Sequence, residues 1–219
     1  MGAVDDILRG GGACGALLRQ VDWAKTSLGP VETWPQSLRT AVGIVLASDY
    51  PLYVAWGPEF VQFYNDAYRP ICGRTKHPAA LGQAAPVTWP EVWHMLGPGW
   101  ERMRRTGEAL FVNDLMMPLD RNGFVEECYF TYSHSPVRDE SGDVAGVFAA
   151  LTETTGQVVG TRRLDTLREL GASTADRATL DDACREAMRV IAAAPLDVPF
   201  ALLYLVDDAT RTARLAGTS

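Results

Sequence analysis

Hydrophobic residues recur along this chain with two periods, and each change of period marks a change of predicted secondary structure. Between residues 34 and 47 they fall at helical spacing, at Trp34, Leu38, Ala41, Val42 and Val45. Steps of three and four residues place such a set on one face of a helix. The preceding Thr-Trp-Pro-Gln, residues 33–36, has the hydroxyl, proline and amide of a capping box, so we expect the helix to begin there.

A similar start occurs at residues 88–91, Thr-Trp-Pro-Glu. Behind it a second stripe of large hydrophobic residues keeps helical spacing, through Trp89, Val92, Trp93, Leu96, Trp100 and Met103. Because Gly97-Pro98-Gly99 interrupts this stripe without changing its phase, we expect one bent helix or two short helices on one axis.

Between and after these helices the period changes to two. Residues 52–56 and 60–64 are predicted to form short strands on either side of the Gly57-Pro58 turn. Longer strands are expected over 109–117, 124–135 and 144–152, separated by the turn sequences DRNG and DESGD. Two strands, a helical segment and a three-strand meander predict an antiparallel α+β domain over residues 48–155.

The segment FYNDAYRPICG, residues 63–73, is crowded with functional groups. Phe63 and Tyr64 end the second strand, and Asn65 or Asp66 is suited to cap the helix that follows. A joint between a strand and a helix accounts for most of these polar groups without catalysis, and we favour that interpretation.

This order of elements, with FYNDAY at the first joint and SPVRDESGDVAGVF at the last hairpin, resembles a PAS domain. The likeness is to the N-terminal PAS modules of bacterial sensor proteins, especially sensor histidine kinases, and it covers residues 10–172. It includes the lead-in VDWAKTSLGPVETWPQSLR and the stretches AWGPEFVQFYNDAY, KHPAALG and RNGFVEECYFTYSHSP. The resemblance implies a five-stranded antiparallel sheet with helices on one face, preceded by an N-terminal helical extension over residues 1–47.

Beyond the PAS segment, residues 156–172 are predicted to form a linker helix, and residues 173–219 resemble the start of a GAF domain. One helical stripe in the second segment comprises Leu180, Ala183, Cys184, Ala187 and Ile191. The strand FALLYLV and a turn at residues 207–210 follow it. Because a hairpin with one helix is only marginally stable alone, we expect a truncated GAF domain at the front of a longer protein, with a natural short form as the alternative.

Composition and charge narrow the functional classes. The 219 residues are 47% hydrophobic and 21% charged, as in ordinary globular proteins, and their formal net charge is −7. This charge argues against nucleic acid or an anionic membrane as a partner, because both favour clustered Lys and Arg. The sequence has no recognisable signal peptide, and Cys14, Cys72, Cys128 and Cys184 lack metal-ligand spacing. We predict a cytoplasmic protein with free thiols and no metal site.

No cofactor is predicted. Haem-binding PAS domains take an axial histidine from the long helix, where this chain has His94. At roughly 100° per residue, His94 lies about 140° from the centre of the tryptophan stripe, so we expect it to face away from the cavity. A flavin photoadduct of the blue-light type needs a reactive cysteine where this sequence has LGQAAPVTWPEVW. A non-covalent flavin stays open.

Enzymatic activity within these 219 residues is not predicted either. Cys72 and His77 are close in sequence to each other and to Lys76, which suits a nucleophile with its base. However, no third residue is identifiable that would orient the histidine, and His77 belongs to the KHP part of the resemblance. Nothing in the sequence indicates that the carboxylates of the strands and turns pair with one another: Asp114, Asp120, Glu126 and Glu127.

Seven aromatic residues fall on segments that surround a central cavity in PAS domains: Trp56, Tyr68, Trp93, Trp100, Phe111, Tyr132 and Phe148. The resemblance implies that they line this cavity. They either fill it or leave room for a small apolar or aromatic ligand oriented by Tyr, Asn or His side chains. Both alternatives stay open at this point.

PAS domains commonly end their last strand with an Asp-Ile-Thr-like motif that connects the sheet to the outgoing helix. In this chain Thr152 takes the place of the Asp and Thr154 that of the Thr. Glu153 is a candidate replacement for the missing carboxylate, although from the neighbouring position it would point to the other face of the strand. Leu164 and Leu167 form a weak coiled-coil stripe in the outgoing helix. We predict that Glu153, Thr154, Leu164 and Leu167 transmit the signal.

The resemblance as a whole implies a sensory input module that passes the state of its cavity through the C-terminal helix to an output domain. The expected output is a protein histidine kinase of a two-component system, with a phosphatase or a cyclic-dinucleotide enzyme as the alternative. A ligand-free dimerisation module is the other functional alternative. We expect a homodimer, because the helix over 34–47 and the helix after residue 155 carry apolar surface that a PAS core does not cover.

Overall fold

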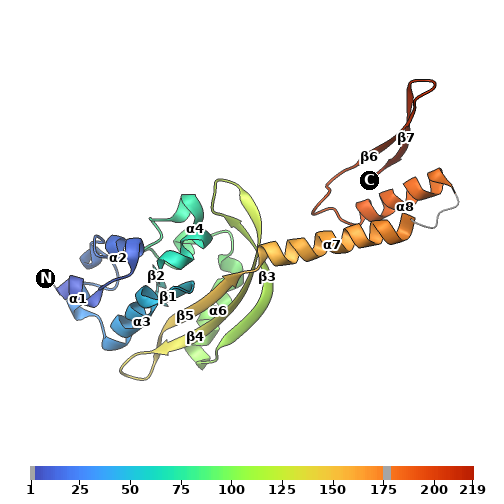
Figure 1. The fold of residues 1–219 in the computed structure, drawn as a ribbon. Helices are drawn as coiled ribbons and strands as arrows, with labels where there is room; N and C mark the ends of the chain where they lie inside the picture. Colours follow the sequence, from blue (N-terminus) through green and yellow to red (C-terminus); the bar gives the residue numbers. More distant parts are fainter. Residues whose placement is uncertain (1–2, 175–178) are drawn as a thin grey trace. The chain divides into compact units, whose positions relative to one another are not determined.

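The computed structural model describes residues 3–174 and 179–219, and the chain divides after Thr155 into two units (Figure 1). The first unit contains a five-stranded antiparallel sheet in the order β2-β1-β5-β4-β3. Its strands are β1 (Leu52–Trp56), β2 (Val61–Tyr64), β3 (Leu110–Asp120), β4 (Val125–Arg138) and β5 (Val144–Glu153). All five predicted strands are therefore present, and this α+β unit is consistent with a PAS fold.

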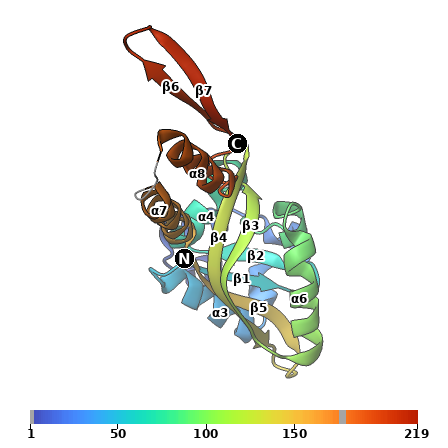
Figure 2. The same ribbon diagram turned by 90° about the vertical axis from the view of Figure 1, so that its right-hand side faces the viewer.

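Helices cover both faces of the sheet: α4 (Arg69–Lys76) and α6 (Trp93–Thr106) of the PAS-like segment lie on one face, as predicted, and the N-terminal extension lies on the other. Helix α3 (Gln36–Ala47) packs on β1 and β2, whereas α6 packs on β4 and β5 (Figure 2). The physical reason lies in β1 and β2, which are buried at every position. A strand that is apolar toward both faces needs a layer on each side. The N-terminal extension supplies the second layer.

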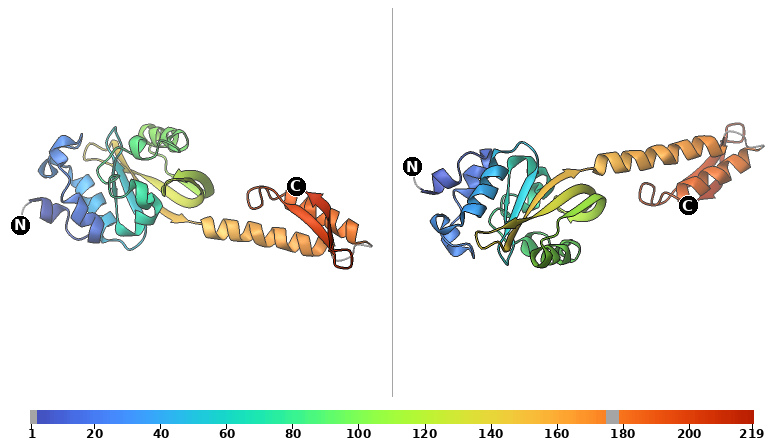
Figure 3. Two further views of the ribbon diagram at one scale, coloured as in Figure 1. Left: turned by 90° about the horizontal axis from the view of Figure 1, so that it is seen from above. Right: turned by 90° about the horizontal axis from the view of Figure 1, so that it is seen from below.

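The rest of the N-terminal extension packs on the same part of the sheet as α3 (Figure 3). It comprises α1 (Ala3–Ile7), α2 (Gly12–Leu18) and two 3₁₀ turns, η1 (Trp23–Lys25) and η2 (Val31–Thr33). The ring of Trp23 stacks on Phe63 of β2 with centroids 5.1 Å apart, and Trp34 meets the same ring edge-on at 5.4 Å. Aromatic packing thus holds the extension to the sheet.

Neither predicted capping box forms. The hydroxyl of Thr33 donates instead to the carbonyl of Pro30 at 2.7 Å, and α3 begins at Gln36. At the second site Thr88 ends the short helix α5 (Ala85–Thr88), and α6 begins at Trp93 and continues through Pro98. Side-chain oxygens that find other partners are not available to cap a helix.

The strand-to-helix joint predicted for FYNDAYRPICG is confirmed. Asn65 caps the 3₁₀ turn η3 (Asp66–Tyr68) by accepting a hydrogen bond from the Tyr68 N–H at 3.2 Å. Its amide nitrogen also donates to the carbonyls of Ser48 and Tyr50, both at 2.7 Å. Asn65 thereby fixes the entry to β1 as well as the start of the next helix, α4 (Arg69–Lys76).

The neighbouring Asp66 connects this joint to the N-terminal extension. Its two carboxylate oxygens accept hydrogen bonds from the backbone N–H groups of Ala13 and Cys14, each at 2.8 Å, in the first turn of α2. Burial raises the pKa of Asp66, but the hydrogen bonds from Cys14 and Ala13 outweigh it and lower the pKa overall. A polar group in the sequence motif therefore serves a structural contact more than fifty residues away.

The second unit comprises two helices and a hairpin. Its elements are α7 (Thr155–Thr174), α8 (Leu180–Ala192), β6 (Leu202–Asp207) and β7 (Thr212–Thr218). Asp197 accepts hydrogen bonds from Arg162 and Arg163, which lower its pKa to about 2. The predicted helix and hairpin of residues 173–219 are present in the described part of that segment, while residues 175–178 lie outside it.

Candidate functional site

A cavity of about 50 Å³ lies between the sheet and the helical segment of residues 68–100. Its sheet wall comes from four strands and consists of Tyr53, Met117, Leu119, Phe130, Tyr132, His134, Ala149 and Leu151. Its helical wall consists of Tyr68, Ile71, Trp89, Val92, Leu96 and Trp100. Since an apolar cavity of about 150 Å³ accepts benzene, this one has room for one or two water molecules or a ligand of comparable size.

A buried glutamine fixes two of the aromatic wall residues. Gln62 of β2 is fully buried, and its Oε1 accepts hydrogen bonds from the Tyr53 hydroxyl at 3.0 Å and the Trp89 indole N–H at 2.8 Å. Its amide nitrogen donates to the carbonyl of Gln83 at 3.1 Å and to the hydroxyl of Thr88. Because every polar atom of Gln62 is bonded, this network holds the two rings in place.

His134 of β4 is the main wall residue that the sequence analysis missed. The indole N–H of Trp100 donates to its Nδ1 at 3.0 Å, and its ring stacks on Tyr132 with centroids 4.3 Å apart. Burial lowers the pKa of His134 to about 3, so the ring is neutral at physiological pH. Because Nδ1 accepts a hydrogen bond from the indole N–H of Trp100, the ring hydrogen lies on Nε2. The sequence does contain a signal for this position, because His134 follows Phe130 and Tyr132 at a spacing of two and so lies on the same face of β4.

Three of the seven predicted cavity residues line the cavity: Tyr68, Trp100 and Tyr132. Trp56, Trp93, Phe111 and Phe148 do not. Trp93 lies in a second layer, with its ring 5.8 Å from Phe60 and 5.6 Å from Trp100. His94 is exposed on α6, on the side of the helix that the spacing predicts.

Trp56 and Phe148 lie on the other face of the sheet because of strand alternation. Tyr53 in β1 and Ala149 in β5 line the cavity, so residues at odd separations from them point to the opposite face. Phe148 accordingly lies beside Ala41 of α3 in a separate surface depression. The segment in which a residue lies does not determine its face of the sheet, because the face depends on the phase of each strand.

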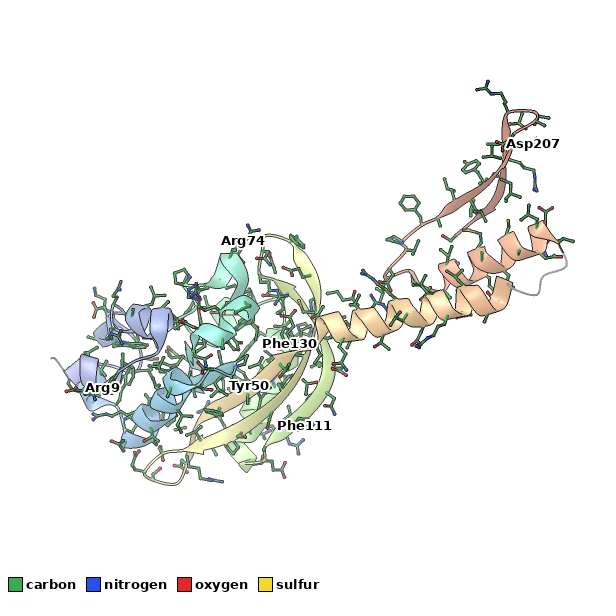
Figure 4. All side chains as sticks on the ribbon, viewed as in Figure 1. Arg9, Tyr50, Arg74, Phe111, Phe130 and Asp207 are labelled. Atoms are coloured by element: carbon green, nitrogen blue, oxygen red, sulfur yellow. The ribbon has the colours of Figure 1, made fainter. Side chains whose placement is uncertain are left out.

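Phe111 is 64% exposed, and its predicted place in the cavity is wrong because of a β-bulge (Figure 4). The pairing of β3 with β4 shifts by one residue between Val112 and Leu115, where Asp114 has a φ of 46°. In an unbroken strand Phe111 would share a face with Met117, which lines the cavity. The extra residue inverts this relation.

The end of β5 is held by an ion pair with the β3–β4 hairpin. Arg121 is buried, and its Nη1 and Nη2 donate to the two carboxylate oxygens of Glu153 at 2.7 and 2.8 Å. Its Nε lies 3.2 Å from Glu126. Burial raises the pKa of Glu153, but the hydrogen bonds from Arg121 and Thr155 and the charge of Arg121 outweigh it, so the pKa is lowered overall.

The same carboxylate is bonded to the first residue of α7. The hydroxyl of Thr155 donates to Glu153 at 2.9 Å and accepts from the backbone N–H of Tyr129 at 2.9 Å. Glu153 and Thr155 therefore link the end of β5 to the start of α7, whereas the sequence suggested Thr152 and Thr154 for the two motif positions. Thr152 is instead hydrogen bonded to Tyr50.

Thr154, the predicted motif threonine, has a buried hydroxyl with no hydrogen-bond partner among the described residues. A buried unpaired hydroxyl costs about 1–3 kcal/mol. We expect Thr154→Val, which keeps the shape of the side chain, to raise the free energy of unfolding by about 1 kcal/mol. Urea denaturation measures this change. Thr155→Val is the matched control and should destabilise, because it removes two hydrogen bonds; a loss of stability in both variants would contradict the assignment.

The residues considered for catalysis, Cys72 and His77, flank the second half of α4. Burial raises the pKa of Cys72 to about 12, so its thiol is protonated at neutral pH. The Nδ1 of His77 lies 3.1 Å from the hydroxyl of Tyr64.

Within residues 3–174 and 179–219, no three His, Cys, Asp or Glu side chains are close enough together to hold a metal ion. None of the helices described has the length and apolar character needed to cross a membrane.

No family model matches the sequence, and comparison with curated proteins finds no match. Solved structures similar to this chain include an RNA-binding light-oxygen-voltage receptor, with 18% identity, a TM-score of 0.43 and coverage of 69% of this chain and 43% of the receptor. The PAS domain from Bordetella pertussis BvgS has 20% identity and a TM-score of 0.45, covering 61% of this chain and 98% of that domain. The Rhodobacter sphaeroides LOV protein has 14% identity and a TM-score of 0.43, covering 74% and 87%. This chain thus matches less than half of the light-oxygen-voltage receptor.

Proposed function

We propose that this chain is a sensory input module of a signal-transduction protein, in which the state of the cavity is passed through β5 to α7. The observation that best supports this is the double contact of Glu153, with Arg121 of the hairpin and with Thr155 at the start of α7. Ala149 and Leu151 of the same strand line the cavity. A change in the cavity would therefore act on a strand whose last residue holds the exit helix.

The output we propose is a protein histidine kinase of a two-component system, with a phosphatase or cyclic-dinucleotide enzyme as the alternative. In this proposal the chain itself is not catalytic, acts in the cytoplasm and works as a homodimer. Helix α3 no longer supports dimerisation, because Leu38, Val42 and Val45 are buried within the chain. Leu164 and Leu167 of α7 still do, since they are 55% and 63% exposed at coiled-coil spacing.

The test is a fusion of the whole chain to the catalytic core of a histidine kinase, with residues inserted after Arg163. Two inserted residues rotate the following helix by about 200°, whereas seven restore its phase within about 20°. We expect the first insertion to change autophosphorylation several-fold and the second to preserve it within about twofold. Equal activity of the two fusions would show that α7 is only a tether.

A second candidate function is a ligand-free dimerisation module, and the small cavity favours it. Pockets for cofactors and drug-sized ligands are typically about 300–1,000 Å³, whereas this cavity has about 50 Å³. The same observation argues against haem or non-covalent flavin in this chain. Native mass spectrometry separates the candidates: a dimer that takes up no small molecule supports the second.

A further inference from the structure

The cavity offers hydrogen-bond donors but no charge. Its lining within the described residues contains no Asp, Glu, Lys or Arg. Three of its polar hydrogens are already bonded, those of Tyr53 and Trp89 to Gln62 and that of Trp100 to His134. The remaining polar groups of the wall belong to His134, Tyr68 and Tyr132.

Among the described residues, these three groups have no hydrogen-bond partner: no hydrogen bond involves Nε2 of His134 or the hydroxyl of Tyr68 or Tyr132. Within the part of the chain that the structure describes, the side-chain atoms that are fully enclosed and lack a partner are Arg39 Nε and Thr154 Oγ1. The three polar atoms of the cavity wall are not among them, so protein atoms do not enclose them completely. All three residues are at least nine-tenths buried and line the cavity. An occupant of the cavity would therefore lie beside all three residues.

The protonation of His134 defines what this space can accept. Since Nδ1 accepts the hydrogen bond from the Trp100 indole N–H, Nε2 carries the ring proton and can only donate. The two hydroxyls can also donate. Buried donors rarely stay unpaired in folded proteins, because each unpaired group has a large desolvation cost. An occupant with a hydrogen-bond acceptor satisfies them, whereas an ionised occupant would lack a counter-ion.

We propose that the cavity binds a small uncharged molecule that carries a hydrogen-bond acceptor, such as a carbonyl oxygen, and that the Nε2–H of His134 is its principal donor. The volume of about 50 Å³ limits the ligand to a few non-hydrogen atoms. The apolar remainder of the ligand would contact Leu96, Met117 and Leu119 of the wall. This inference rests on the proposed sensory function and names the chemical class of its ligand.

The experiment compares acetone with isobutene, which has the same shape but a methylene group in place of the oxygen. Binding is followed by NMR through the ring nitrogens of His134 and the indole nitrogen of Trp100. We expect acetone to shift the His134 Nε2 signal and to bind about 10-fold more tightly than isobutene, the ratio that one neutral hydrogen bond provides. Equal affinities for the two molecules would overturn the proposal.

Variants of single polar groups test the donor. His134→Phe should reduce the preference for acetone to within about twofold, and Tyr132→Phe, which removes only a hydroxyl, should weaken it if the first variant does not fold. Tyr129→Phe is the matched control, because Tyr129 lies on the same strand but its hydroxyl bonds to Glu127 outside the cavity. An unchanged preference in His134→Phe would contradict the role of this histidine.

Xenon separates the remaining outcomes, because it enters apolar cavities without needing a donor. Binding of xenon without a preference for acetone would overturn the ligand class while leaving the cavity accessible. Exclusion of both xenon and acetone would show a cavity closed or held by tightly bound water, and would also overturn the proposal. Acetone binding combined with equal activity of the two insertion fusions would contradict the sensory function but not the ligand class.

Discussion

Gly73→Ala is expected to lower the free energy of unfolding by about 3 kcal/mol or more. Gly73 interrupts α4 with φ 60° and ψ −164°, a backbone conformation that is essentially restricted to glycine. A Cβ atom added there would collide with the carbonyl oxygen of Arg121. That oxygen cannot easily move away, because it accepts a hydrogen bond from the Thr75 N–H at 3.1 Å.

Gly43→Ala is the matched control. Gly43 lies inside α3, and an added Cβ would meet no atom within 4 Å. Alanine should therefore stabilise the protein by about 0.5–1 kcal/mol, the difference in helix propensity. Urea denaturation of both variants gives the comparison. A loss below about 1 kcal/mol in Gly73→Ala would mean that the kink of α4 relaxes and does not depend on glycine.

The elements of the PAS-like unit were predictable because each depends on a local pattern. Period-two segments bounded by Gly and Asp turns identified all five strands, and the stripe from Leu38 to Val45 identified α3. Helix starts were less predictable. The hydroxyls of Thr33 and Thr88 could cap a helix, but in the folded chain a carbonyl of Pro30 and the amide of Gln62 are their partners. Such competition depends on tertiary contacts that local sequence does not contain.

The candidate site was less predictable than the fold, because it depends on the phase of each strand. Phe111 points outward because of the bulge at Asp114, and no glycine or proline beside it in the sequence indicates a bulge. His134 occupies a position of β4 at which the alternating pattern predicts an apolar residue. Its polar ring is accommodated there by the hydrogen bond from the Trp100 indole N–H, which the sequence does not indicate. In the same way, the partnership of Glu153 with Arg121 joins residues 32 positions apart.

Glu153→Gln is expected to lower the free energy of unfolding by about 3 kcal/mol at pH 7, the lower end of the range for a broken buried ion pair. The variant leaves the buried guanidinium of Arg121 without its bidentate partner, and Glu126 at 3.2 Å compensates for only part of the charge. Glu101→Gln is the matched control. Its exposed pair with Arg104 spans 3.6 Å, so the change should stay within about 0.5 kcal/mol.

Acidification should remove the difference between the wild-type protein and Glu153→Gln. The pKa of Glu153 is lower in the folded chain than in the unfolded chain, where it is about 4.3. Its contribution to stability is therefore fully present above that unfolded value and is lost as the pH falls through the lowered folded value. Urea denaturation from pH 7 down to about pH 3 should show the two proteins converging at the acidic end, with a constant difference between about pH 6 and 8.

The double variant Arg121→Met with Glu153→Met separates the effect of an unpaired charge on stability from the effect of losing the hydrogen bond of Thr155. Replacing both partners of a buried pair by apolar residues is often close to neutral, whereas removing one leaves an unpaired charge. We therefore expect the double variant to be more stable than Glu153→Gln, although only the double variant removes the acceptor of the Thr155 hydroxyl. A double variant as unstable as the single one would show that losing the hydrogen bond from Thr155 costs as much stability as leaving Arg121 without its bidentate partner.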